Sequence, residues 1–201
     1  MHLASGGNLT ATISSVLAGD SGVLYNGTGS GTKILALGGD NTFTGGLTVM
    51  NGTVELRTSE ALNKSGVNSL NMLGGTLRLN GYNATVASLD GGGTVNNNAA
   101  TASTLTVNGG GTFTGNLNNG STGALALTKK GGGTLILGGA NAYTGETIVE
   151  EGILYVNQTG NSSTGGTLSG TTTITVKQGG TFRINNGNAS NNSATASTML
   201  R

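Results

Sequence analysis

The chain has 201 residues, of which 39 are glycine, and it contains neither proline nor cysteine. Nine basic and eight acidic residues, scattered singly, give a net charge of +1. The lack of cysteine excludes disulfides and thiolate metal sites, and the lack of a basic stripe argues against a nucleic-acid partner. The many glycines argue against helices. A disordered chain would carry more charge and fewer than the 34% hydrophobic residues found here.

A stretch near the N-terminus returns 100 residues later. GGDNTFTGGLTVMNGTVEL at 38–56 aligns without a gap with GGANAYTGETIVEEGILYV at 138–156. Repetition at a fixed offset predicts that both stretches form the same structure, with the aromatic side chain filling a bend of the coil. The recurring residues for which we expect structural roles are Asn41, Phe43, Thr44 and Gly45 in the first copy and Asn141, Tyr143, Thr144, Gly145, Val149 and Gly152 in the second.

A shorter word, Gly-Gly-Thr or Asn-Gly-Thr followed by alternating apolar residues, recurs about every 20 residues, and we expect all its copies to occupy one position of a coil. Alternation, as in Leu77 and Leu79, sends every second side chain to one face of a strand. Stacking such short units buries these faces in one core. The pattern predicts a parallel β-solenoid of about nine or ten coils as a single segment over residues 1–201. The threonines of the words are Thr53, Thr76, Thr94, Thr112, Thr134 and Thr181.

An antiparallel barrel or sandwich is the competing all-β fold. It requires hairpin turns, for which the Asn-Gly pairs beginning at Asn26, Asn51, Asn80 and Asn119 are suitable. Hairpins do not explain why one word recurs in the same orientation, so the solenoid is favoured.

The longest copy of the repeat, at 124–157, reads ALALTKKGGGTLILGGANAYTGETIVEEGILYVN. Its Leu-x-Lys start, GTL-x-L strand, N-x-Y-T-G bend and V-x-x-G-x-L ending resemble the passenger-associated transport repeat of autotransporter proteins. A more degenerate copy covers 31–56. The resemblance implies an autotransporter passenger, a right-handed parallel β-helix that is secreted or displayed on a Gram-negative cell. It also implies a C-terminal translocator barrel in the outer membrane, which we expect outside this chain.

Neither end of the sequence resembles the end of such a protein. The first residues lack the charged and apolar layout of a signal peptide. ATASTMLR at 194–201 echoes ATASTLTV at 100–107 and stops within a coil. We therefore expect the chain to be an excerpt of a longer passenger.

The sequence offers few candidate catalytic or metal-binding residues. Glu150 and Glu151 are neighbours on an expected strand, so their carboxylates would point to opposite faces and make a poor glycosidase pair. His2 is the sole histidine, which leaves no His-based triad or zinc site. We expect no catalytic residue, no cofactor and no metal ion.

Alignment of the short words places two pairs of side chains next to each other in successive coils. Glu55 meets Arg78, which predicts an ion pair between neighbouring strands. Tyr155 meets Arg183, which predicts a cation–π contact.

The leading hypothesis is a structural, surface-presenting stalk. The alternative is an adhesin or receptor-binding effector that contacts a host-cell surface or matrix protein through loops at Thr58–Asn71 and Asn157–Gly170, where the sequence departs from a minimal coil. Unpaired strand edges at the ends of a solenoid further predict head-to-tail self-association. A polysaccharide-active enzyme lacks its carboxylates, and an ice-binding solenoid is disfavoured because the Thr-x-Thr words fall at different positions of the coil.

Overall fold

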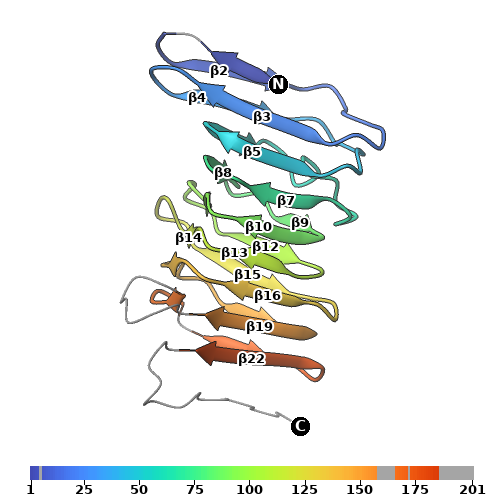
Figure 1. Ribbon diagram of the computed structural model, residues 1–201, viewed down its shortest axis with the longest axis vertical. Coiled ribbons are helices and arrows are strands. Elements are labelled where there is room, and N and C mark those ends of the chain that lie inside the picture. Colours follow the sequence, from blue (N-terminus) through green and yellow to red (C-terminus); the bar gives the residue numbers. More distant parts are fainter. Residues whose placement is uncertain (5, 158–165, 172, 186–201) are drawn as a thin grey trace.

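The computed structural model describes residues 1–4, 6–157, 166–171 and 173–185, which form a long stack of parallel strands (Figure 1). These residues contain 22 strands, and each neighbouring pair in the four sheets runs parallel. They include no helix, and hence none that is long and apolar enough to span a membrane. The prediction of a parallel β-solenoid is confirmed, and the antiparallel barrel or sandwich is excluded.

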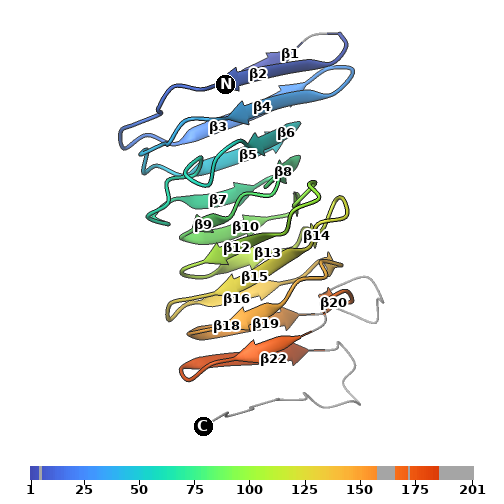
Figure 2. The ribbon, with the colours of Figure 1, turned by 180° about the vertical axis from the view of Figure 1, so that it is seen from behind.

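The strands form three sides of the solenoid, which run along its long axis (Figures 1 and 2). Sheet A contains β1 (His2–Ala4), β3 (Val23–Thr28), β5 (Leu47–Asn51), β7 (Ser69–Met72), β10 (Ser88–Gly91), β13 (Gly111–Phe113), β16 (Thr134–Leu137), β19 (Gly152–Asn157) and β22 (Gly180–Asn185). Sheet B contains β2 (Leu9–Ile13), β4 (Lys33–Leu37), β6 (Thr53–Leu56), β8 (Thr76–Arg78), β11 (Thr94–Asn96) and β14 (Asn116–Asn118). Sheet C contains β9 (Ala84–Val86), β12 (Ser103–Val107), β15 (Leu125–Lys129), β18 (Thr147–Val149) and β21 (Ile174–Val176), and sheet D pairs β17 (Ala140–Asn141) with β20 (Thr167–Leu168).

The third side changes character along the molecule. From β9 onward it is sheet C, whereas residues 14–22, 38–46 and 57–68 form loops in the first three turns. These three loops stack on one another through backbone hydrogen bonds, such as Thr42 N–H to Leu17 O at 2.8 Å and Asn41 N–H to Glu60 O at 3.1 Å. The loops therefore continue the solenoid without forming strands.

The described residues make about seven turns, fewer than the nine or ten expected. The reason is the length of a turn, which varies and often exceeds 20 residues. In sheet A, Leu70 pairs with Leu89, 19 residues on, but Val156 pairs with Ile184, 28 residues on. Residues 186–201 also lie outside the described part. The right-handed sense of the coil stays a prediction.

Inward-facing side chains from all sides form one apolar core. In sheet B, Val54, Leu77, Val95 and Leu117 are partners in successive turns, and all four are fully buried. Full burial of such a side chain contributes about 1.5–3 kcal/mol. The alternation of the short words therefore has the energetic role expected from the sequence.

The expectation that all the Gly-Gly-Thr words occupy one position is wrong. Thr53, Thr76 and Thr94 are partners in sheet B, but Thr94 next pairs with Asn116. Thr112 instead lies in β13 of sheet A, the sheet that also holds Thr134. The word specifies a glycine corner followed by a strand, which is a local structure. Which side that strand joins depends on the number of residues in the rest of the turn.

Three glycines of successive turns leave no room for a side chain. A Cβ at Gly115 would lie 1.9 Å from the carbonyl oxygen of Gly93, and one at Gly139 would lie 1.7 Å from that of Gly115. We call Gly93, Gly115 and Gly139 the glycine column. It requires glycine because the backbone of the preceding turn occupies the space of a Cβ.

Candidate functional site

The second repeat copy forms slightly more than one turn, with a bend between β16 and β18. Asn141 is fully buried at this bend. Its Oδ1 accepts a hydrogen bond from the backbone N–H of Leu117 in the preceding turn (3.0 Å), and its Nδ2 donates to the carbonyl oxygen of Gly139 (2.9 Å). The side-chain oxygen thus satisfies a backbone donor of the preceding turn at the point where sheet B ends at β14 and β17 belongs to sheet D.

Tyr143 fills the inside of the same bend. Its ring is 1% exposed, and its Oη lies 2.7 Å from Thr147 Oγ1. Burial raises the pKa of Tyr143, and the hydrogen bond with Thr147 opposes this shift in part. Gly145 follows, where a Cβ would lie 2.4 Å from Leu125 O, and Gly152 forms the next corner with a φ of 71°. Thr144 is exposed, and its N–H donates to Asn119 Oδ1.

The first copy makes the corresponding contacts. Asn41 Oδ1 accepts from Leu17 N–H (2.8 Å), and its Nδ2 donates to Ala61 O (2.8 Å), so this side chain joins three successive turns. Phe43 is 1% exposed, and Thr44 is exposed. A Cβ at Gly45 would lie 2.2 Å from the nitrogen of Gly22.

The two copies lie on different sides of the solenoid. The strand before the bend is β4 of sheet B in the first copy and β16 of sheet A in the second. After the bend come β5 of sheet A and β18 of sheet C, followed by β6 of sheet B and β19 of sheet A. The repeat is therefore one local structure, displaced by one side of the coil between its two occurrences.

Each copy also contains a corner with a buried lysine. The Lys129 ammonium donates to the carbonyl oxygens of Lys130 and Gly131, both at 2.6 Å, and to that of Glu151 at 3.2 Å. Burial lowers the pKa of Lys129, whereas the Glu151 carboxylate raises it. The ammonium groups satisfy carbonyl oxygens that the corners leave without backbone donors.

In the first copy, the buried lysine is Lys33, which follows the corner glycine Gly31, whereas Lys129 precedes Gly131. Its ammonium donates to Gly7 O at 2.6 Å and to Ser30 O. Gly31, which lies between Ser30 and Lys33 in the chain, has a φ of 75°. Gly131 in the second copy has a similar φ of 66°. The sequence pattern does not predict either role, because the two lysines stand at different positions of the repeat.

The predicted ion pair between Glu55 and Arg78 is confirmed. Arg78 Nη1 lies 2.9 Å from Glu55 Oε1, and Arg57 Nη2 lies 2.9 Å from the other carboxylate oxygen. Tyr155 and Arg183 are register partners in sheet A, as expected, while their cation–π contact stays a prediction.

Glu150 and Glu151 do not lie on a strand, contrary to expectation, because the chain turns a corner between β18 and β19. Glu150 pairs with Lys130 at 3.2 Å and with Lys177 at 2.7 Å, one turn to either side. Lys177 and then Lys130 lower the pKa of Glu150. The carboxylate thus joins three corners. Within the described ranges, no three His, Cys, Asp or Glu side chains converge on a possible metal site.

The predicted recognition loop at Thr58–Asn71 is shorter than expected and only partly projects. Asn71 lies in strand β7, because its neighbour Leu70 pairs with Leu47 and enters the core. Within the loop, Ala61 and Leu62 are buried. The Lys64 side chain is 77% exposed and pairs with Glu60, and Val67 is 49% exposed. Thr58 donates to Asp40 Oδ1 at 3.1 Å.

The second predicted loop, Asn157–Gly170, falls mostly on residues 158–165, which lie outside the described residues. Asn157 is the last residue of β19. Gly170 follows β20, and a Cβ there would lie 2.6 Å from the carbonyl oxygens of Ala142 and Tyr143.

Two further buried asparagines, Asn68 and Asn97, have similar roles that the sequence pattern does not predict. Asn68 donates to Phe43 O and Leu62 O and accepts from Gly46 N–H. Asn97 donates to the carbonyl oxygens of Thr101 and Gly123 and accepts from Gly81 N–H. Nothing in an asparagine-rich sequence distinguishes these two from exposed asparagines, because neither lies in the part of the repeat that recurs.

The fold thus defines an all-β, parallel β-solenoid whose recurring unit is a strand, an asparagine bend and a glycine corner. Residues 28–56 and 127–156 both match the family model of the passenger-associated-transport-repeat. The chain therefore carries two autotransporter passenger repeats, with bounds that differ by three residues at most from those predicted. No curated protein and no solved structure matches the chain.

Proposed function

We propose that this chain is part of the extracellular stalk of a Gram-negative autotransporter passenger, with a structural and presenting role and no enzymatic activity. Two passenger repeats within one continuous solenoid, whose sheet A runs through nine strands, carry the proposal. Each turn offers the next an edge of backbone donors and acceptors, so a solenoid extends by stacking and needs no distant contacts. A translocator barrel beyond this chain would anchor the full-length protein in the outer membrane.

The experiment places the chain between an export signal and an autotransporter barrel, with an epitope tag at its N-terminus. We expect antibody to reach the tag on intact cells, and expect a variant with both Asn41→Leu and Asn141→Leu to show less surface tag at equal expression. Tag that remains in the periplasm with the unaltered chain would contradict the stalk function. The same fusion with a short glycine–serine linker in place of the chain serves as the control.

The loops of the first three turns favour a second function, adhesion through the side of the stalk. They present Val16, 56% exposed, and Val67, 49% exposed, on one side of the molecule. Exposed loops on a rigid scaffold are frequent recognition sites. The partner would be a host-cell surface or matrix protein.

Adhesion is tested by saturable binding of the labelled protein to mammalian cells and to matrix proteins. We expect Lys64→Glu with Val67→Ser to abolish binding and Leu73→Ser, a substitution at a 60% exposed residue outside the loops, to preserve it. Equal binding by both variants, or no binding by the unaltered protein, would contradict adhesion through these loops. Only the stalk function would then stand. End-to-end self-association stays a prediction, for which sedimentation velocity over a range of concentrations is the measurement.

A further inference from the structure

A polar slot of about 450 Å³ lies between the corners that follow β3 and β5. Glycines form much of its wall. A slot of this size is within the range of about 300–1,000 Å³ that small-molecule sites occupy. Its lining side chains are Thr28, Thr32, Lys33, Asn51 and Thr53.

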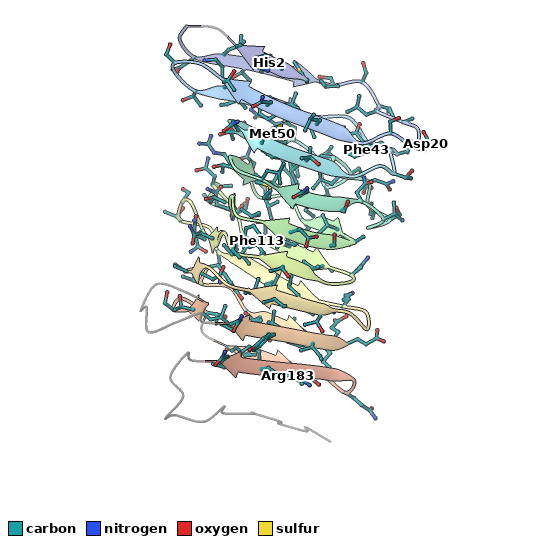
Figure 3. The ribbon with its side chains drawn as sticks, viewed as in Figure 1. His2, Asp20, Phe43, Met50, Phe113 and Arg183 are labelled. Carbon is teal, nitrogen blue, oxygen red and sulfur yellow. The ribbon has the colours of Figure 1, made fainter. Side chains whose placement is uncertain are left out.

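An irregularity in the strand pairing separates these corners. Between β3 and β5 the register shifts, with Tyr25 opposite Val49 but Asn26 opposite Asn51, so Met50 is an extra residue. This is the one register shift among the strand pairs of the described chain. Met50 is 37% exposed at the end of β5, next to the slot residue Asn51 (Figure 3). The slot is thus a consequence of a local insertion into an otherwise regular stack.

The lining is rich in hydrogen-bonding groups but presents little free charge. The Lys33 ammonium already donates to Gly7 O and Ser30 O, and no carboxylate lines the slot. The threonine hydroxyls can both donate and accept. Asn51 uses its Nδ2 on Asn26 Oδ1 at 2.9 Å, which leaves its Oδ1 as an acceptor. Such a surface suits an uncharged ligand with several hydroxyl groups.

A buried hydroxyl lies directly beneath the slot. Tyr25 is fully buried, and its Oη has no hydrogen-bond partner. A Cβ at Gly27 would lie 2.4 Å from this Oη, and one at Gly52 would lie 3.1 Å from the ring carbon Cε1. Two glycines of the slot wall therefore lie against the Tyr25 ring and its hydroxyl.

We propose that this slot binds one residue of an uncharged carbohydrate. Thr28, Thr32 and Asn51 hydrogen-bond its hydroxyl groups. The site lies at the corner where the chain passes from sheet A to sheet B, away from the loops considered for adhesion. It would add a glycan contact to the stalk. It does not depend on the chain having a presenting role.

The experiment titrates the ¹⁵N-labelled chain with glucose, galactose and N-acetylglucosamine into the tens of millimolar. We expect saturable shifts of the Thr28, Thr32 and Asn51 amides with at least one sugar, at a millimolar Kd. The combined Thr28→Val and Thr32→Val variant, which keeps side-chain volume, should weaken this binding at least about tenfold. Thr112→Val, on the outer face of sheet A, should leave it unchanged.

Asn51→Ala is a second test if the double variant does not fold, and the same loss is expected. Absence of saturable shifts with all three sugars would overturn the proposal. So would shifts that persist in a folded slot variant. Preferential binding of sulfate or acetate at the same amides would show that the slot binds anions, and would also overturn the proposal.

Discussion

Asn41 and Asn141 make the same contact at two places on the molecule, one hundred residues apart. Each accepts a hydrogen bond from the backbone N–H of a leucine 24 residues earlier, Leu17 or Leu117. Yet the bends that hold them lie on different sides of the solenoid, after a strand of sheet B and of sheet A respectively. The asparagine thus belongs to a unit that carries its own link to the turn below, whichever side that unit occupies.

Replacing Asn141 with alanine should destabilise the protein. The Leu117 N–H would lose its acceptor in a buried environment, which lowers the free energy of unfolding by about 1–3 kcal/mol. Urea denaturation followed by circular dichroism measures the loss. Asn71→Ala, on the outer face of β7, is the control and should change stability by less than about 0.5 kcal/mol. Equal effects of the two substitutions would show that the Asn141 amide has no special role.

The two buried tyrosines should respond differently to loss of the hydroxyl. Tyr25 Oη has no partner, so Tyr25→Phe should leave the free energy of unfolding unchanged or raise it by about 1 kcal/mol. Tyr143 Oη is bonded to Thr147, so Tyr143→Phe should lower it by about 1 kcal/mol. The same denaturation experiment compares them. A matching loss in both would mean that Tyr25 Oη is satisfied in solution.

Local patterns in the sequence predict the core and the repeated unit, but not the assembly of turns. Alternation identifies Leu77 and Leu79 as buried, and repetition marks Asn41 and Asn141. The side that a strand joins depends on the total length of each turn, which is why Thr94 and Thr112 lie in different sheets despite identical words.

The role of the buried lysine is a second feature that the sequence does not predict. Lys129 stands in a recognisable Leu-x-Lys motif, but its three carbonyl partners belong to a corner whose shape the motif does not encode. The folded part of the Thr58–Asn71 loop was missed for a similar reason, since Ala61 and Leu62 show no periodicity that would mark them as buried.

Glu150 should contribute to the loss of stability in acid. Its folded-state pKa lies below the unfolded value of about 4.3, so its ion pairs stabilise the fold above that pH and lose this contribution as pH falls through the lowered pKa. Glu150→Gln should therefore flatten the stability curve below about pH 4.3, by a small amount because the pairs are partly exposed. Urea midpoints across this range measure the slope. Asp20→Asn is the control, and an unchanged slope in Glu150→Gln would contradict the prediction.

The glycine column should tolerate no side chain. Gly139→Ala would place a Cβ 1.7 Å from Gly115 O, so two turns must separate locally, and the free energy of unfolding should fall by about 3 kcal/mol or more. Gly132→Ala is the matched control in the same repeat, because nothing lies within 4 Å of its added Cβ and its φ is not in the left-handed region. That change should stabilise by about 0.4–1 kcal/mol, because alanine restricts the unfolded chain. Thermal and urea denaturation of both variants decide the matter. If Gly139→Ala is as stable as Gly132→Ala, the close approach of the turns at the glycine column does not require glycine, and the prediction is wrong.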